Sequence, residues 1–266
     1  MTEIFVELGE RSYSIEIERD LVKTALEREA YIVTDYNVAN AYSQLLKDKP
    51  NVVIIKPGEL SKSLKLYGSL AKKLKDAEKI IAFGGGVVGD LTGFVASTLK
   101  RGIPLMQVPT TLLSMVDASI GGKNGINLDG RKNYLGTIYQ PNGIYVDPNL
   151  LKTLPKTEIT NGVAEIIKYG AIKDSFLLER MQNEFSIEDK DLEGLIAKCV
   201  NIKKYFVELD ERDENIRHAL NFGHTIGHAV ELEYDLSHGQ AISIGMVYES
   251  LLTFDRNKTR KIITAL

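Results

Sequence analysis

The sequence predicts two domains: an α/β domain with a mostly parallel, Rossmann-like sheet, and an all-α domain after it. Three observations support this fold class. Short apolar runs alternate with helix-forming stretches in the first half of the chain, and the strand signals stop after Asp147-Pro148. From Thr157 onward the sequence is helix-forming, with glycine or polar breaks near Gly170, Ser186 and Glu214. We therefore expect an α/β domain at residues 1–148 and a helical domain at residues 149–266.

The predicted sheet begins with a hairpin formed by residues 4–8 and 12–17. Five short apolar runs follow, of the kind that parallel strands buried on both faces produce. They lie at residues 30–35, 51–55, 79–83, 104–108 and 143–147. Helical stretches separate some of these runs, notably residues 38–47 and 63–75. This order predicts a doubly wound domain.

Composition restricts the classes of function. The 266 residues are 44% hydrophobic and 26% charged, with a net charge of -3, which is typical of a globular protein. The absence of a basic excess argues against nucleic acid as a partner. No segment approaches the roughly 20 apolar residues of a membrane span. Because Cys199 is the single cysteine, an intramolecular disulfide is excluded, and we expect a cytoplasmic protein.

A glycine run follows the predicted strand at residues 79–83. Gly84, Gly86 and Gly89 match the pattern GxGxxG, and a predicted helix begins within the run. Glycines let a backbone approach a diphosphate closely, and the helix N-terminus supplies N–H donors. The pattern follows a late strand and has no acidic residue about 20 positions on, so a simple tight turn is the alternative. Asp35, at the end of the run at residues 30–35, and Asn37 are candidate partners for ribose hydroxyls.

Polar side chains interrupt the apolar, glycine-rich stretch that follows. They are Thr110, Thr111, Asp117, Lys123, Lys132 and Asn133. Such groups suit a cleft that binds an anionic ligand, although lysine and asparagine are also common in surface loops. As a set, with two lysines near glycine turns, they favour anion binding.

All four histidines fall within residues 218–238. Histidine is the commonest metal ligand, so this grouping predicts a metal-dependent site. His224 and His228 are four residues apart and share one helix face, and His238 follows ten residues later. The spacing alone favours His224 and His228 as paired ligands.

Glu165 offers an oxygen ligand to the same site. It lies three residues before Lys168 on one face of another predicted helix. A glutamate and a lysine at this spacing are by themselves more often a surface pair. Together with imidazoles, however, a carboxylate makes a donor set for which zinc is the natural ion.

Seven segments of the chain resemble those of the 3-dehydroquinate synthases, which are sugar-phosphate cyclases. The segments are residues 84–90, 100–104, 109–113, 120–123, 161–168, 221–228 and 237–239. The resemblance implies a dehydroquinate synthase-like fold and a carbon-oxygen lyase that uses NAD and a divalent metal, zinc first and cobalt second. The implied reaction converts 3-deoxy-D-arabino-heptulosonate 7-phosphate to 3-dehydroquinate and phosphate, with NAD recycled. It belongs to the shikimate pathway, which leads to chorismate and the aromatic amino acids.

The resemblance also implies roles for individual residues. The metal ligands would be Glu165, His224 and His238. The NAD contacts would be Asp35, Asn37, Glu59, Lys62, Gly84, Gly85, Gly86, Asp90, Thr110, Thr111, Asp117, Lys123, Lys132 and Thr153. Substrate and phosphate would be held by Arg101, Lys123, Asn133, Lys168, Lys203, Arg217, Asn221 and His228. In this assignment His228 serves in proton transfer, and His218 has no direct role.

Other functions stay open. Members of the family continue beyond the position where this chain ends, so a catalytically impaired, truncated form or a binding subunit is one alternative. Another sugar-phosphate cyclase is the second, and a metal-dependent polyol dehydrogenase that uses NAD is the third. We expect a small-molecule sugar phosphate as the partner, neither nucleic acid nor a membrane, and a homodimer as a candidate assembly.

Overall fold

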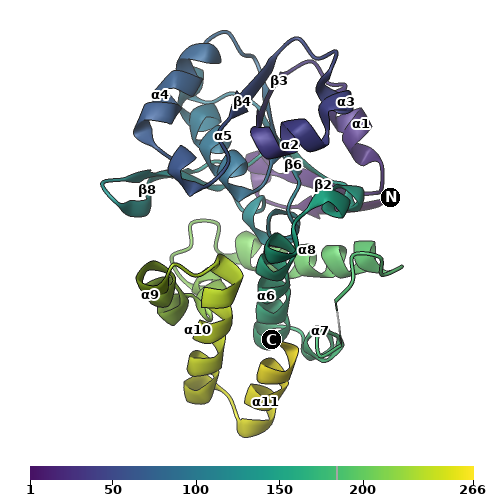
Figure 1. The fold of residues 1–266 in the computed structure, drawn as a ribbon, viewed down its shortest axis with the longest axis vertical. Helices are drawn as coiled ribbons and strands as arrows, with labels where there is room; N and C mark the ends of the chain where they lie inside the picture. Colours follow the sequence, from purple (N-terminus) through teal and green to yellow (C-terminus); the bar gives the residue numbers. More distant parts are fainter. Residues whose placement is uncertain (184) are drawn as a thin grey trace. The chain divides into compact units, whose positions relative to one another are not determined.

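The computed structural model describes residues 1–183 and 185–266, and these residues form two compact units (Figure 1). Unit 1 is Met1–Thr153 and unit 2 is Leu154–Leu266. Pro148, where the sequence predicts the boundary, begins the short 3-10 helix η5 (Pro148–Thr153) at the end of unit 1. Within the described residues, no helix has both the length and the apolar character that a membrane span requires.

Unit 1 is built on a seven-stranded sheet with the order β1-β2-β9-β6-β5-β3-β4. β1 is antiparallel to β2, and the other neighbouring strands are parallel, which confirms the predicted mostly parallel sheet. The strands are β1 (Thr2–Val6), β2 (Tyr13–Ile17), β3 (Tyr31–Asp35), β4 (Val52–Ile55), β5 (Ile80–Gly84), β6 (Leu105–Pro109) and β9 (Gly143–Val146).

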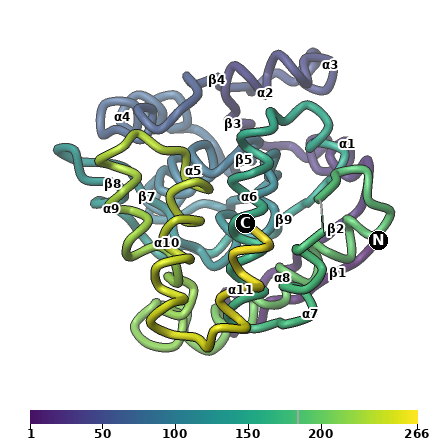
Figure 2. Tube along the Cα trace, turned by 60° about the horizontal axis from the view of Figure 1, so that its bottom comes forward, coloured from purple at the N-terminus to yellow at the C-terminus, as the bar shows by residue number. Residues whose placement is uncertain are grey.

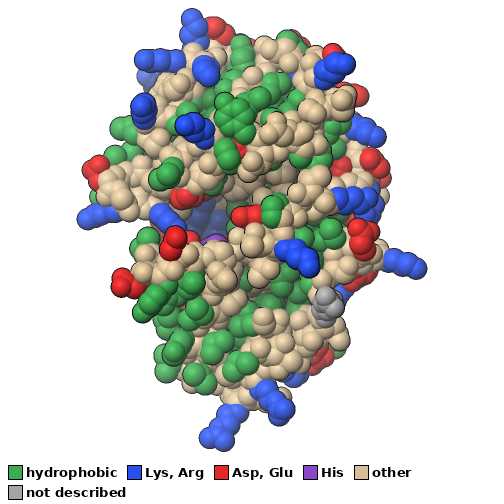
Figure 3. Space-filling view, in the orientation of Figure 1, with side chains coloured by type: hydrophobic (Ala, Val, Ile, Leu, Met, Phe, Trp, Pro, Cys, Tyr) green, Lys and Arg blue, Asp and Glu red, His purple; other side chains and the backbone are tan. Residues whose placement is uncertain are grey.

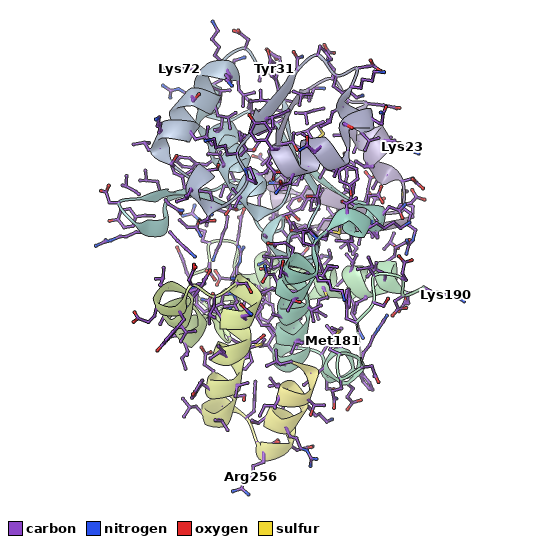
Figure 4. All side chains as sticks on the ribbon, in the orientation of Figure 1. Lys23, Tyr31, Lys72, Met181, Lys190 and Arg256 are labelled. Carbon is purple, nitrogen blue, oxygen red and sulfur yellow. The ribbon has the colours of Figure 1, made fainter. Side chains whose placement is uncertain are left out.

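The helices of unit 1 connect these strands. They are α1 (Leu21–Leu26), α2 (Tyr36–Ala41), α3 (Ser43–Leu46), α4 (Leu64–Lys73) and α5 (Gly86–Thr98), with short η1 (Gly9–Arg11), η2 (Glu59–Ser61), η3 (Leu99–Arg101) and the π-helical η4 (Ser114–Ala118). The helix predicted at residues 38–47 is divided into α2 and α3 at Tyr42. Leu70 and Leu74 of the α4 region join Leu91 of α5 in a core that also buries Ile80 of β5. Lys72 of α4 points outward from this core (Figure 4).

The order in which successive strands join the sheet reverses between β3 and β5. After β3 the chain goes to the edge strand β4, and then it returns to the other side of β3 to form β5 and continues to β6. The carboxyl ends of β3 and β5 are therefore neighbours, with Val33 in register with Ala82. In open α/β sheets, ligands bind outside the carboxyl ends of the strands at such a switch point.

Residues 123–138 form a second, two-stranded sheet that the sequence pattern does not indicate. β7 (Lys123–Leu128) and β8 (Arg131–Ile138) pair antiparallel, with Gly125 opposite Gly136. Glycine and asparagine disfavour strands when taken alone, so local propensity gives little signal here. Of the polar residues predicted in this glycine-rich stretch, Lys123, Lys132 and Asn133 thus lie on a hairpin.

Unit 2 is helical in its described residues, as the sequence predicts. Its elements are α6 (Lys156–Ile172), α7 (Ser175–Arg180), α8 (Leu192–Leu209), the 3-10 helix η6 (Ile216–Asn221), α9 (His224–Tyr234), α10 (His238–Thr253) and α11 (Arg256–Ala265). α9 and α10 run side by side (Figure 2). Hydrophobic side chains gather over the part of unit 2 that α9 and α10 form (Figure 3), where Tyr248, Leu251 and Leu252 are exposed.

Asp174 caps the N-terminus of α7. Its carboxylate accepts a hydrogen bond from the N–H of Leu177 at 3.0 Å and lies 3.0 Å from the Nζ atom of Lys198. Burial raises the pKa of Asp174, but these partners outweigh that effect and hold the pKa below its ordinary value of 3.8. The ionised cap therefore stabilises the fold above that value, and its contribution is lost as the pH falls through the lowered pKa.

We expect the substitution Asp174→Ala to lower the free energy of unfolding at pH 7 by about 1 kcal/mol, the usual loss for a removed cap. Asp174→Asn should lose less, because the amide oxygen still accepts the Leu177 bond. Urea unfolding at pH 7 and pH 3 measures both variants. The difference between Asp174→Ala and the unaltered chain should shrink at pH 3, and an equal difference at both values would contradict the assignment.

Candidate active site

Glu165 and Lys168 form an ion pair inside α6. Their side chains are 0% and 2% exposed, and the Lys168 Nζ atom contacts a carboxylate oxygen of Glu165 one turn away. The pair is thus buried, in contrast to the usual surface pair at this spacing. An unpaired buried charge costs several kcal/mol, so the carboxylate requires cationic partners.

The N-terminus of α9 presents His224 to Glu165. Gly223 precedes the helix at φ 81°, and its N–H donates to the Glu249 carboxylate of α10 at 2.7 Å. The N–H of Ile226 donates to the same carboxylate at 3.2 Å. Glu249 therefore satisfies two N–H groups that the first turn of a helix leaves without a partner, and its charge complements the helix dipole.

Close packing of α9 on α10 determines how near their histidines lie. A Cβ atom on Gly245 would overlap the carbonyl oxygen of Gly223, so glycine is required at this crossing. α10 begins at His238, after a capping box formed by Ser237 and Gln240. The N–H of Gly239 donates to the Asn161 side chain of α6 at 2.7 Å, which ties the start of α10 to the helix that carries Glu165.

These helices bring together the three predicted metal ligands. The Nε2 atoms of His238 and His224 lie 3.1 and 3.4 Å from the same Oε1 atom of Glu165. The three ligand atoms lie within 4.8 Å of one another. Two imidazole nitrogens and one carboxylate oxygen match the three-ligand donor set of catalytic zinc sites, which keep a position open for substrate or water.

Electrostatics keeps this carboxylate ionised. Burial would raise the pKa of Glu165, but the Lys168 ammonium and hydrogen bonds from His224 and His238 hold that pKa well below its usual range. For His238, burial lowers the pKa, and the hydrogen bond and charge of Glu165 more than offset it, so the net shift is upward. An ionised carboxylate beside imidazoles is the form that binds a divalent cation.

The predicted substrate residues of unit 2 lie on neighbouring elements. η6 contacts both α6 and α8, which carry Lys168 and Lys203. Lys203 is 8% exposed, and Arg217 of η6 is 1% exposed and donates to the carbonyl of Glu211 at 2.7 Å. Asn221, at the end of η6, and His228 are exposed. Buried cations next to exposed polar groups suit an anionic substrate.

Asp210 shapes the loop that carries Arg217. Its carboxylate accepts hydrogen bonds from the N–H groups of Glu214, Asn215 and Arg217 at 3.0, 2.6 and 3.1 Å. These bonds, led by that from Glu214, hold the pKa of Asp210 below its usual range. His218 lies in the same region, with its Nε2 atom 2.7 Å from the Asp213 carbonyl oxygen.

In unit 1 the glycine turn lies at the switch point of the sheet. Gly84 ends β5, and Gly85 precedes α5 without any side chain that caps it. A Cβ atom on Gly85 would lie 2.8 Å from the Cγ2 atom of Thr111. The N–H of Thr110 donates to the Gly84 carbonyl at 3.0 Å. The backbone donors at the start of α5, which begins at Gly86, thus form an anion-binding arrangement.

Asp35 lies beside this turn, at the end of β3. Its Oδ1 atom accepts hydrogen bonds from the N–H groups of Asn37 and Val38 at 2.8 and 3.0 Å, so it also caps α2. The strand register that pairs Val33 with Ala82 continues toward Asp35 and Gly84. A carboxylate next to a glycine turn is the arrangement that holds a ribose and a diphosphate.

A second polar cluster in unit 1 surrounds Lys62. Its Nζ atom lies 2.6 Å from Asp90 and 3.7 Å from Glu59, and it donates to the Asn133 side chain of β8. Burial raises the pKa of Asp90, although the charge of Lys62 partly offsets this. Asn133, predicted on the substrate side, is therefore next to residues predicted to contact NAD.

The remaining predicted residues of unit 1 are more dispersed. Arg101 lies in η3, after α5, whose 13 residues span about 20 Å from the glycine turn. Thr153 hydrogen bonds to the Tyr42 hydroxyl at 2.6 Å. Asp117 is half-buried in η4, and Lys123 and Lys132 are exposed on the hairpin.

Two acidic residues that lie near the histidines are not predicted from the sequence. Glu249 contacts the start of α9 from a different helix, and no local signal marks it. Glu231 lies three residues after His228, and its ligand atom is within 4.8 Å of those of His228 and His238. Helical spacing extended along α9 would have found Glu231.

Comparisons with known proteins agree with this geometry. The family model described as 3-dehydroquinate synthase N-terminal matches residues 52–161, and the one described as 3-dehydroquinate synthase C-terminal matches residues 162–265. The 3-dehydroquinate synthase of Clostridium botulinum is 42% identical over an alignment of 272 positions, gaps included, that covers 92% of this chain and 77% of that protein.

Solved structures show the same architecture. The 2-epi-5-epi-valiolone synthase of Streptomyces hygroscopicus, with NAD+ and Zn2+ bound, is 26% identical with a TM-score of 0.87 over 97% of this chain and 81% of that chain. A 2-deoxy-scyllo-inosose synthase, complexed with carbaglucose-6-phosphate, NAD+ and Co2+, is also 26% identical, with a TM-score of 0.80 over 93% and 75% of the two chains. Family models that cover most of the sequence and a relative of this similarity lead to one conclusion: the chain belongs to the 3-dehydroquinate synthase family.

Proposed function

We propose that the protein converts 3-deoxy-D-arabino-heptulosonate 7-phosphate to 3-dehydroquinate and phosphate. The observation that carries the proposal is the convergence of His224 and His238 on the buried carboxylate of Glu165. Family membership, with a relative 42% identical, supports this reaction over that of another sugar-phosphate cyclase.

Glu165, His224 and His238 would hold the divalent cation, for which zinc is the first candidate and cobalt the second. The first turn of α5, with Gly84, Gly85 and Gly86 before or within it, would hold the NAD diphosphate, and Asp35 a ribose. When bound, NAD supplies a reversible hydride acceptor, and the cation supplies positive charge that favours loss of a hydroxyl proton.

The chain's own side chains would position the substrate and move its protons. His228 is the exposed imidazole next to the ligand set, with its ring 5.2 Å from that of His224, and it would serve as general acid and base. Lys168, Lys203, Arg217 and Asn221 would bind the substrate. The phosphate would be bound by Arg101, Lys123 and Asn133, because guanidinium and ammonium groups pair well with phosphate.

Three further assignments belong to the proposal. We propose a cytoplasmic enzyme, which agrees with the single buried cysteine, Cys199. A homodimer would allow a second copy to supply Arg101, which lies beyond the far end of α5 from the glycine turn. We also propose that nucleic acid is not a partner, in line with the net charge of -3.

The first test supplies the full chain with NAD, zinc and the heptulosonate phosphate. We expect stoichiometric release of phosphate without accumulation of NADH, since each turnover returns the hydride. A polyol dehydrogenase would accumulate NADH. A different cyclase would release no phosphate from this substrate, and an impaired or binding form would bind NAD without turnover.

A substitution of His228 separates its role from metal binding. We expect His228→Ala to lower turnover by about 10²- to 10⁴-fold, because general acid-base catalysis contributes factors of this size. Its zinc content, measured by mass spectrometry after dialysis, should stay near that of the unaltered chain. Loss of the zinc instead would show that His228 is a ligand.

The glycine turn can be tested by adding one methyl group. Gly85→Ala places a Cβ atom 2.8 Å from Thr111, so we expect the dissociation constant for NAD to rise at least about tenfold in calorimetry. Gly68→Ala is the matched control, because a Cβ atom there meets nothing within 4 Å and alanine favours a helix. If both variants bind NAD as the unaltered chain does, the turn is structural only.

Glu249 should act on the metal through His224. Glu249→Gln removes the charge that holds the first turn of α9, so we expect zinc affinity, measured by competition with a chelator, to fall by about 10- to 100-fold. Glu233→Gln makes the same change at an exposed position of α9 and should have no effect. Equal zinc affinities for the two variants would contradict a positioning role.

A further inference from the structure

Metal-binding side chains form a row along α9. His224, His228 and Glu231 are spaced by four and three residues, which places them on one face of the helix. His238 of α10 lies opposite this row, with its ring 5.5 Å from that of His224. The row extends about two turns along α9 beyond His224, the ligand already assigned on this helix.

The row contains two overlapping sets of ligand atoms. The inner set is Glu165, His224 and His238, and the outer set is His228, Glu231 and His238. In each set the ligand atoms lie within 4.8 Å of one another. The inner set includes a fully buried carboxylate, whereas the outer set has an exposed His228 and a half-buried Glu231.

We propose that the outer set is a second position for a divalent cation of the zinc or cobalt class. Two imidazole nitrogens and one carboxylate oxygen repeat the donor types of the inner set, and such ions prefer these donors. The outer position binds more weakly, because its exposed side chains must be ordered when the ion arrives. It is filled when the inner set is disabled or when metal is in excess.

Because His238 belongs to both sets, the two positions are coupled. An imidazole nitrogen with one lone pair ligates one ion at a time, so the outer ion competes for His238 or takes its other nitrogen. In either case the outer ion also occupies a nitrogen of His228. If His228 transfers protons, as the proposed function requires, excess metal inhibits the enzyme.

The binding test uses apo-protein of the full chain and zinc alone. His224→Ala disables the inner set, and equilibrium dialysis with elemental analysis then measures the remaining zinc. We expect His224→Ala to bind about one zinc ion per chain when zinc is in excess, and the added substitution Glu231→Gln to weaken that binding at least about tenfold. The control is Glu233→Gln added to His224→Ala, and it should leave zinc binding unchanged.

Two outcomes overturn the proposal: no zinc bound by folded His224→Ala, or equal zinc affinity with and without Glu231→Gln. Circular dichroism establishes folding, and if His224→Ala does not fold, Glu165→Gln disables the inner set for the same comparison. Turnover in excess zinc is measured separately. If Glu231→Gln weakens zinc binding while excess zinc leaves turnover of the unaltered chain intact, the cation position stands and the proposed role of His228 fails.

Discussion

The burial of one carboxylate organises unit 2. Glu165 is fully buried in α6, and a buried anion is tolerated only where cations or strong donors surround it. Lys168 supplies one charge from the same helix, and the other partners come from α9 and α10. The requirement therefore extends to the packing of those helices, since His224 and His238 reach one oxygen only if α9 and α10 approach closely. The glycine at position 245 and the carboxylate of Glu249 meet that need.

In unit 1 the backbone, and not a set of charged side chains, provides the candidate anion-binding groups. An anionic cofactor can be held by N–H groups at a helix start, which need no countercharge, provided that side chains stay out of the way. The sheet order places this helix start, at Gly86, after β5 and beside β3. Topology thus positions Asp35 next to the glycine turn, although the two are far apart in the sequence.

Much of this could be predicted because the signals are local. The buried strands and the glycine turn depend on runs of a few residues, and the spacing of His224 and His228 gives their shared face directly. The hairpin of β7 and β8 could not be predicted, because its glycines carry no strand propensity and its stability depends on pairing. The role of Glu249 could not be predicted either, because its hydrogen bond with Gly223 joins α10 to the start of α9.

The same limit explains why helical spacing alone favours His224 and His228 as a pair, whereas tertiary packing groups His224 with Glu165 and His238. Spacing makes His224 and His228 equivalent, since both lie on one face of α9. They differ in what lies opposite: His224 meets the buried carboxylate of α6, whereas His228, one turn on, is exposed beside Glu231. Burial therefore distinguishes two imidazoles of one row: His224 faces an ionised carboxylate, and His228 stays accessible. The spacing of His224, His228 and Glu231 in the sequence places them on one helix face. Only tertiary packing gives these side chains different surroundings and therefore different chemical properties.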